Sequence, residues 1–151
     1  MDKGLFVITV ASEKGGVGKT TIATNLAVYL KALREDLPVS ILSFDNHFSV
    51  DNMFAIGSHS GRSVGEIFAG GRFADLLQLG EYGVHFMVSQ RDLQPPDGDV
   101  FHLRRSLRDE SVSGILIIDT RPILDYFTRN ALNVADLVLT PVKDRASLVN
   151  A

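Results

Sequence analysis

The sequence contains no cysteine, which excludes disulfide bonds, thiolate metal sites and a cysteine nucleophile. Long apolar runs are also missing, since none approaches the roughly 20 residues that a transmembrane helix needs. A charged start followed by apolar residues 5–11 has the outline of a short signal peptide. Cleavage there would remove the segment that leads into a glycine-rich loop, so we expect no secretion. These absences predict a cytoplasmic chain without a transmembrane segment.

The chain also lacks a large excess of charge of either sign, since its formal net charge is −3. Such a balance gives no overall attraction to nucleic acid or anionic lipid, although it leaves room for a local patch. The four histidines lack the spacing of metal ligands. The small basic group on one predicted helix is expected to be a solvated face rather than a DNA contact; it consists of Arg104, Arg105 and Arg108.

The 151 residues, 45% of them hydrophobic, suit one globular domain spanning 1–151. Short apolar runs alternate with helical periodicity, which predicts an α/β fold: a three-layer α/β/α arrangement with a mainly parallel sheet of about five strands. The predicted strands are 5–11, 39–44, 84–88, 114–118 and 137–140. The predicted helices are 20–33, 64–69, 73–79, 100–108 and 123–134, and 46–62 is predicted to be a loop with room for one helical turn.

Two predicted helices give a specific expectation for their apolar residues. In the helix over 20–33, Ile22, Leu26, Tyr29, Leu30 and Leu33 recur at helical spacing, which indicates an apolar face. In the helix over 100–108, the core-facing residues are predicted to be Phe101, Leu103 and Leu107.

The strongest motif is the loop Lys14-Gly15-Gly16-Val17-Gly18-Lys19-Thr20-Thr21, which lies between a predicted strand and a predicted helix. Glycines allow successive backbone N–H groups to converge on phosphate oxygens, and the helix N-terminus adds a partial positive charge. Lys19 is predicted to contact the β- and γ-phosphates, Thr20 to bind Mg²⁺ through its hydroxyl, and Thr21 to contact the α-phosphate. The sequence therefore predicts a phosphate-binding loop.

Carboxylates follow two of the predicted strands. Ligands of open α/β sheets bind beyond the carboxyl ends of the strands, and both Asp45 and Asp119 fall there. Asp119 ends an apolar run, as does the acidic residue that holds Mg²⁺ in P-loop proteins. Asp51, farther along the loop after Asp45, is expected to be solvated.

The glycine loop resembles the deviant P-loop of the ParA/MinD ATPases. The usual loop starts with glycine where this chain has Glu13, whereas Lys14 occupies the position of the family's signature lysine. The segments 119–122 and 130–142 also resemble the family. Departures occur at Ser43, where the family commonly has the first aspartate of an Asp-x-Asp pair, and at Arg121, where it commonly has proline.

This resemblance implies a Mg²⁺-dependent ATPase that acts as an ATP-dependent dimerisation switch in DNA partitioning or protein positioning. It implies that Lys14 reaches the nucleotide of a partner copy in a homodimer and that Asp45 orients the attacking water or supports Mg²⁺. It also implies a nucleotide-binding core that lacks the family's C-terminal part, and it leaves a stimulating partner protein and DNA as open partners.

Two alternatives stay open. Ser43 and Arg121 motivate a nucleotide sensor with little turnover. A ligase or small-molecule kinase on a related P-loop domain is disfavoured by Lys14, since such relatives generally lack the signature lysine.

Overall fold

A computed structural model describes residues 4–12, 18–45, 47–57, 62–96, 98–108 and 112–142. Strands and helices alternate along the chain, as predicted. The strands are β1 (Leu5–Val10), β2 (Val39–Ser43), β3 (Gln78–Leu79), β4 (His85–Phe86), β5 (Gly114–Asp119) and β6 (Leu137–Leu139). The helices are α1 (Lys19–Leu33), α2 (Ser49–Phe54), α3 (Phe73–Leu76), α4 (His102–Arg108) and α5 (Tyr126–Val134), with 3₁₀ helices η1 (Val64–Ile67) and η2 (Glu81–Gly83).

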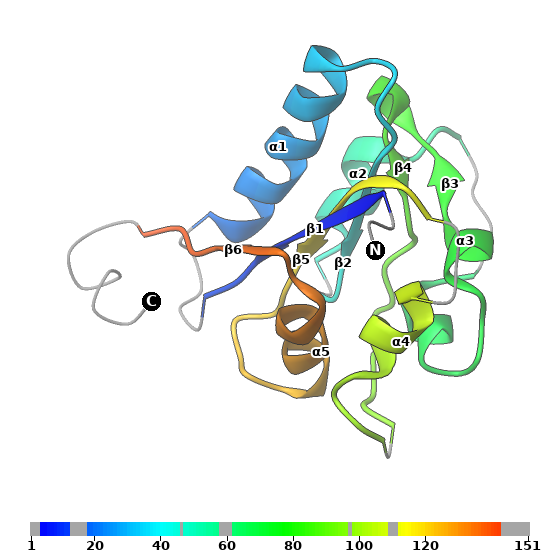
Figure 1. The fold of residues 1–151 in the computed structure, drawn as a ribbon, viewed down its shortest axis with the longest axis vertical. Coiled ribbons are helices and arrows are strands. Elements are labelled where there is room, and N and C mark those ends of the chain that lie inside the picture. Colours follow the sequence, from blue (N-terminus) through cyan, green and yellow to red (C-terminus); the bar gives the residue numbers. More distant parts are fainter. Residues whose placement is uncertain are drawn as a thin grey trace.

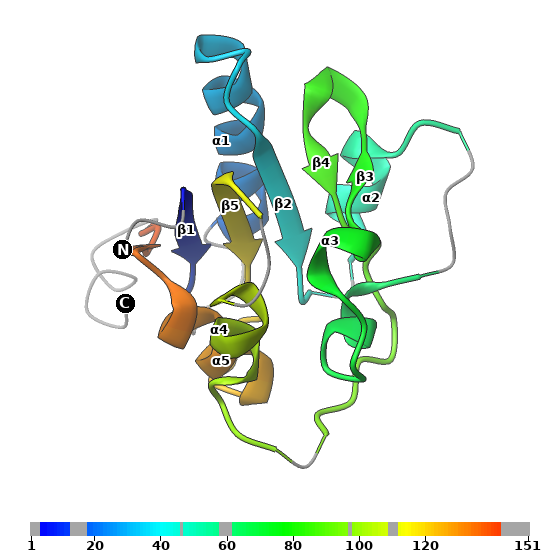
Figure 2. The ribbon, with the colours of Figure 1, turned by 45° about the vertical axis from the view of Figure 1, so that its right-hand side comes forward.

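The strands form one sheet in the order β3-β4-β2-β5-β1-β6. All neighbouring pairs are parallel except β3 and β4. Helix α1 lies on one side of the sheet, and α4 and α5 lie on the other (Figures 1 and 2). The predicted three-layer α/β fold is confirmed, with six strands instead of about five. The extra strand is Gln78–Leu79, which we had placed in a helix and which pairs antiparallel with β4.

Two hydrophobic clusters hold the layers together, one on each face of the sheet. Successive strand residues point to opposite faces, and β5 shows this alternation: Ile117 packs in the cluster beneath α1, whereas Leu116 and Ile118 pack in the cluster beneath α4 and α5. Every one of these side chains is fully buried. The central strands are therefore fixed from both sides, as the near-continuous apolar runs predicted.

Helix α1 meets the sheet mainly through small side chains, and only part of the predicted apolar face packs against the core. Ala23 and Ala27 are fully buried, whereas Tyr29 is 61% and Leu33 59% exposed. Alanine lets the helix backbone approach the sheet closely, with Leu26 and Leu30 partly buried against the same cluster. The prediction of the helix is confirmed, and the prediction of its apolar face is right for Leu26 and Leu30 but wrong for Ile22, Tyr29 and Leu33.

Three smaller expectations are also corrected. Phe101 is 44% exposed and is not a core residue, although Leu103 and Leu107 are buried as predicted. Asp51 is buried rather than solvated, because it lies in α2 and accepts hydrogen bonds from Ser89 N. Helix α5 starts after Asp125, whose side chain accepts a hydrogen bond from Thr128 N and so caps the helix three residues later than predicted.

Candidate functional site

The centre of the candidate site is the carboxylate of Asp119 at the end of β5, which is fully buried. Its Oδ2 accepts hydrogen bonds from Thr20 Oγ1 at 2.7 Å and from Ser43 Oγ at 2.8 Å. Its Oδ1 is buried and has no hydrogen-bond partner among the described residues. A buried charged group is costly unless it is fully paired, so this carboxylate is set up to interact with a further group.

The register of the sheet brings these residues together. Asp119 lies opposite Val10 of β1 on one side and opposite Ser43 of β2 on the other. All three residues end parallel strands, so the segments that follow them meet at one edge of the sheet. The chain leaving β1 enters α1, which places Thr20 in the first turn of the helix, next to Asp119.

The electrostatics of Asp119 follow from this burial. Burial raises the pKa of Asp119 from its ordinary 3.8 to about 6, against the lowering effect of the hydrogen bonds from Thr20 and Ser43. The nearby Asp45 carboxylate also raises this pKa, and the Lys19 ammonium lowers it. The site thus concentrates negative charge in a place with little solvent.

The start of α1 supplies backbone donors. Its N-cap residue, Gly18, has φ 92°, a left-handed conformation that glycine adopts without strain, and it makes no side-chain cap hydrogen bond. Lys19 is buried at the first helical position. The N–H groups at the start of a helix favour an anion, because they point along the axis and carry a partial positive charge, and α1 is 15 residues long.

Asp45 lies just beyond β2 and is paired with a histidine. Its Oδ1 is 3.1 Å from His47 Nδ1, with the two side chains 13% and 74% exposed respectively. The backbone N–H of Asp45 donates to Ser43 Oγ at 3.0 Å. The Ser43 hydroxyl thus links the backbone of Asp45 to the carboxylate of Asp119. The sequence indicated only that a carboxylate common in the family is missing at this position.

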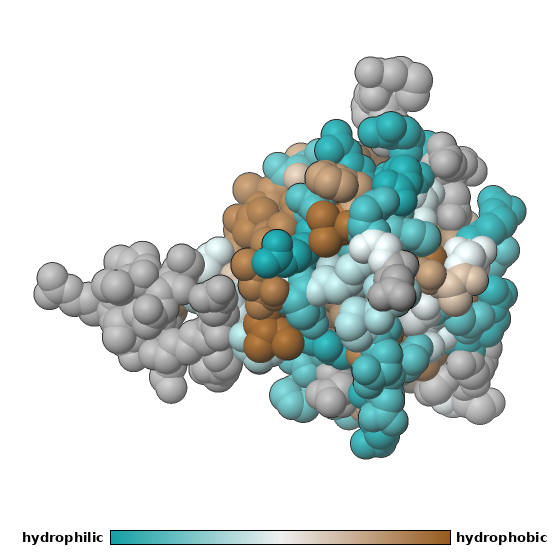
Figure 3. Space-filling view, turned by 90° about the horizontal axis from the view of Figure 1, so that it is seen from below, coloured by the Kyte–Doolittle hydropathy of each residue, from teal (hydrophilic) through white to brown (hydrophobic). Residues whose placement is uncertain are grey.

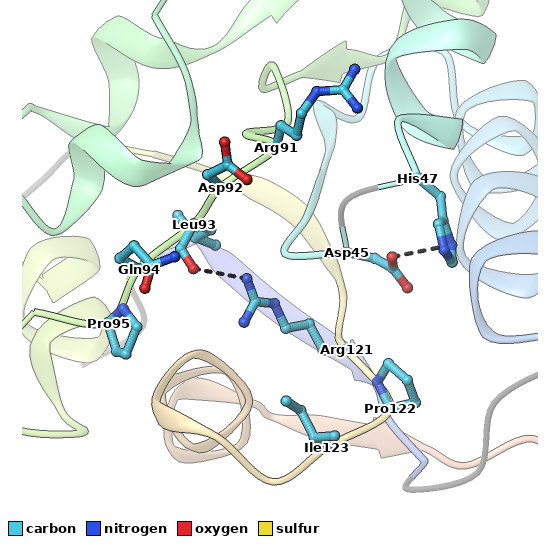
Figure 4. A pocket seen from close by; sticks show the side chains of 10 residues that line it. All are labelled: Asp45, His47, Arg91, Asp92, Leu93, Gln94, Pro95, Arg121, Pro122 and Ile123. Carbon is cyan, nitrogen blue, oxygen red and sulfur yellow. Dashed lines mark hydrogen bonds and ion pairs between the residues drawn. The ribbon is translucent and has the colours of Figure 1, made fainter.

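Asp45 also lines a cavity of about 500 Å³ beside this network (Figure 4). Arg121 and Pro122 from the segment after β5 form part of the wall, and the loop 91–95 closes the other side. The sequence did not indicate that this loop reaches the site. The contact depends on long-range packing, which no local pattern reports.

The predicted site residues fall into two groups. The structure brings Lys19, Thr20, Asp45 and Asp119 to one place, and it leaves Thr21 exposed on the first turn of α1. The predicted residues Lys14, Gly15, Gly16 and Val17 lie outside the described part of the chain.

The donor set fits a divalent cation of the hard, oxygen-preferring kind. The unpartnered Oδ1 of Asp119 and the adjacent Thr20 hydroxyl are both oxygen donors, as Mg²⁺ prefers. A cation would also favour the ionised form of the buried carboxylate.

Comparison with known proteins agrees with this geometry. A family model described as the CobQ/CobB/MinD/ParA nucleotide binding domain matches residues 8–149. The chain belongs to this family. It is 33% identical over 140 residues to the chromosome-partitioning ATPase Soj of Thermus thermophilus, an alignment that covers 90% of this chain and 54% of Soj. The chain therefore spans about half the length of Soj. The resemblance to the ParA/MinD family is confirmed.

Solved structures of other proteins share the fold. One is cobyrinic acid a,c-diamide synthase from Mycobacterium smegmatis with bound ATP analog and magnesium (TM-score 0.78, 25% identity, covering 91% of this chain and 60% of that chain). Another is a protein assigned to plasmid partition in Borrelia burgdorferi, with AMPPNP bound (TM-score 0.80, 24% identity, covering 96% and 66%). The second similarity shows the fold alone.

The surface around the site includes apolar side chains. Seen from below, apolar residues gather on the side of the molecule where β6 lies (Figure 3). Exposed apolar residues in this part of the chain include Ile123 and Leu124 after β5 and Leu137 and Val138 in β6.

Among the helices that the structure describes, none is long and apolar enough to cross a membrane.

Proposed function

We propose that this chain binds ATP with Mg²⁺ and hydrolyses it, as the core of an ATP-dependent dimerisation switch. The observation that carries the proposal is the contact between Asp119 and Thr20, which joins a buried carboxylate to the first turn of α1. Among the described residues, Oδ1 of this carboxylate has no hydrogen-bond partner. A triphosphate and a cation have complementary needs, since the phosphate requires N–H donors and the cation requires oxygen ligands.

Each predicted residue then has a role in the proposal. The backbone N–H groups of Gly15, Gly16, Val17 and Gly18 surround the phosphates, Lys19 neutralises the β- and γ-phosphate charge, and Thr21 contacts the α-phosphate. Thr20 and Asp119 hold Mg²⁺, which supplies charge neutralisation for the transferring phosphoryl group. Asp45 supports the metal or orients the attacking water, which its position at the rim of the cavity allows.

The switch requires a second copy of the chain. In the proposal, Lys14 of each protomer contacts the nucleotide of its partner, and the segments after Asp45 and Asp119 rearrange when the γ-phosphate leaves. Soj is named a chromosome-partitioning ATPase. We therefore propose that this chain is the nucleotide-binding core of a partitioning or positioning protein, with DNA and a stimulating protein as candidate partners.

A phosphate-release assay with Mg²⁺ and ATP tests the hydrolysis. We expect turnover in the parent, and we expect Lys19→Ala and Asp45→Ala each to reduce it by roughly two orders of magnitude or more, because charge stabilisation and water positioning are lost. Asp36→Ala is the matched control, since Asp36 forms an exposed ion pair with Arg34 beyond the far end of α1. Turnover that survives in both variants would show that the activity does not come from this site.

One observation favours a second candidate, a nucleotide sensor with little turnover. The hydroxyl of Ser43 stands where the family commonly has a carboxylate, and it is already engaged with Asp119. The same assay separates the two functions when it is combined with a binding measurement. If the parent binds nucleotide but releases phosphate no faster than Asp45→Ala does, the sensor is favoured.

A further inference from the structure

Arg121 joins three segments that are distant in sequence. Its Nε donates to Phe44 O at 3.0 Å, its Nη2 to Leu93 O at 3.0 Å, and its Nη1 to Asp125 Oδ2 at 2.9 Å. The guanidinium carbon also lies 5.2 Å from the centre of the Phe127 ring. The side chain is only 21% exposed.

Two of these acceptors belong to the candidate site. Phe44 directly precedes Asp45, and its own N–H donates to Asp119 O at 3.0 Å. Leu93 is buried and anchors the loop 91–95, which forms the opposite wall of the cavity that Asp45 lines. Figure 4 shows the Arg121 side chain extending across the cavity toward Leu93. One side chain therefore spans the space between the Asp45 segment and this loop.

The chemistry of arginine makes this connection stiff. The guanidinium is planar and its donors have fixed directions, so its acceptors cannot shift independently without breaking a hydrogen bond. The ion pair with Asp125 fixes the group to the start of α5. A displacement of Phe44 and Asp45 would therefore be transmitted to Leu93.

We propose that Arg121 is a positioning residue that couples the nucleotide state of the site to the loop 91–95, and thereby to the shape of the cavity. This inference rests on the proposed nucleotide binding at Asp45 and Asp119. It assigns the loop 91–95 to the responding part of the switch, in addition to the two segments that carry the carboxylates. Arg121 acts through the backbone that it holds and does not contact the nucleotide.

Hydrogen–deuterium exchange of the whole chain, with and without a Mg²⁺-bound non-hydrolysable ATP analogue, tests this coupling. In the parent we expect the analogue to slow exchange in the loop 91–95. Arg121→Lys keeps the charge but loses the planar set of guanidinium donors. In this variant we expect exchange in the loop to be roughly tenfold faster than in the parent, and the response to the analogue to be lost. The matched control is Arg129→Lys, which changes an exposed arginine of α5 in the same way.

A second variant covers the case in which Arg121→Lys does not fold. Asp125→Asn removes the charge that holds Nη1, while asparagine can still cap α5. We expect a smaller loss of the same response.

A calorimetric titration of the parent with the analogue distinguishes failure of the proposed function from failure of the coupling alone. If the parent binds no analogue, the proposed function and the coupling both fail. If the parent binds the analogue but exchange in the loop 91–95 does not slow, the coupling alone is wrong. The same holds if exchange slows as much in Arg121→Lys and Asp125→Asn as it does in the parent.

Discussion

At the scale of single residues, Asp119 is the group on which the site depends. Its carboxylate is buried, one oxygen accepts two hydrogen bonds, and the other has no partner among the described residues. The ionised form is thus disfavoured in the nucleotide-free protein, which explains why burial raises its pKa to about 6. A cation next to Oδ1 would remove this penalty.

This penalty predicts a pH dependence of stability. The pKa of Asp119 is raised from 3.8 to about 6, so the folded protein holds the proton more tightly than the unfolded chain does. The free energy of unfolding should fall as pH rises from about 4 to 6, by about 3 kcal/mol at most for this group. Denaturant unfolding at a series of pH values, without Mg²⁺ or nucleotide, should show this fall in the parent and less of it in Asp119→Asn. Parallel pH profiles for the two proteins would contradict the electrostatic interpretation.

Ser43 gives a second prediction at the same scale. Ser43→Asp would place another carboxylate beside Asp119, to whose Oδ2 the hydroxyl now donates at 2.8 Å. Repulsion between like charges should lower the thermal midpoint without metal, and Mg²⁺ should raise that midpoint more in the variant than in the parent. Ser43→Asn is the neutral control of similar size. A Mg²⁺-dependent shift no larger than that of Ser43→Asn would argue against a metal at Asp119.

At the scale of secondary structure, the connection into β5 depends on one glycine. Gly114 has φ 87°, its N–H donates to Gly4 O at 2.6 Å, and a Cβ there would overlap Pro38 O. Gly114→Ala should therefore lower the free energy of unfolding by about 2 kcal/mol or more, through backbone strain and overlap together. Gly70→Ala isolates the strain, because Gly70 has φ 94° with open space where the Cβ would lie. Urea unfolding of both variants checks this, and an equal loss in the two would show that the overlap is relieved at no cost.

The elements also show what the sequence could and could not predict. Residues 7–10 of β1 and 116–119 of β5 are buried on both faces, so apolar composition alone located these strands. The glycine loop and the carboxylate at the end of β5 indicated where Lys19, Thr20 and Asp119 lie, since parallel strands end at a common edge. The large residues of α1 predicted its buried face only in part, because its fully buried contacts are made by Ala23 and Ala27, whereas Leu26 and Leu30 are partly buried.

Long-range contacts were equally hidden from local patterns. Arg121 was identified only as a departure from the family, and nothing in the sequence indicated that its guanidinium would bridge Phe44 and Leu93. The segment between β2 and β4 was the hardest to interpret. Short helices and a two-residue strand carry too few residues for their periodicity to be distinguished from that of a loop.

At the scale of the whole molecule, the chain belongs to the CobQ/CobB/MinD/ParA family and spans about half the length of its Thermus relative. The proposed dimer makes one prediction for the entire assembly. Lys14→Gln should still bind nucleotide but should lose ATP-dependent dimerisation, because the cation that reaches the partner's phosphates is gone. Light scattering with a non-hydrolysable analogue measures this, with Lys31→Gln at the far end of α1 as the control. Dimers in Lys14→Gln at the parent's level would contradict the contact between protomers.

The most direct test of nucleotide binding at this site is a calorimetric titration of the folded chain with ATP and Mg²⁺. We predict saturable binding in the parent, weaker binding when Mg²⁺ is removed, and no measurable binding in Lys19→Ala. A parent that releases no heat at saturating nucleotide, or a Lys19→Ala variant that binds as tightly as the parent, would contradict nucleotide binding at this site.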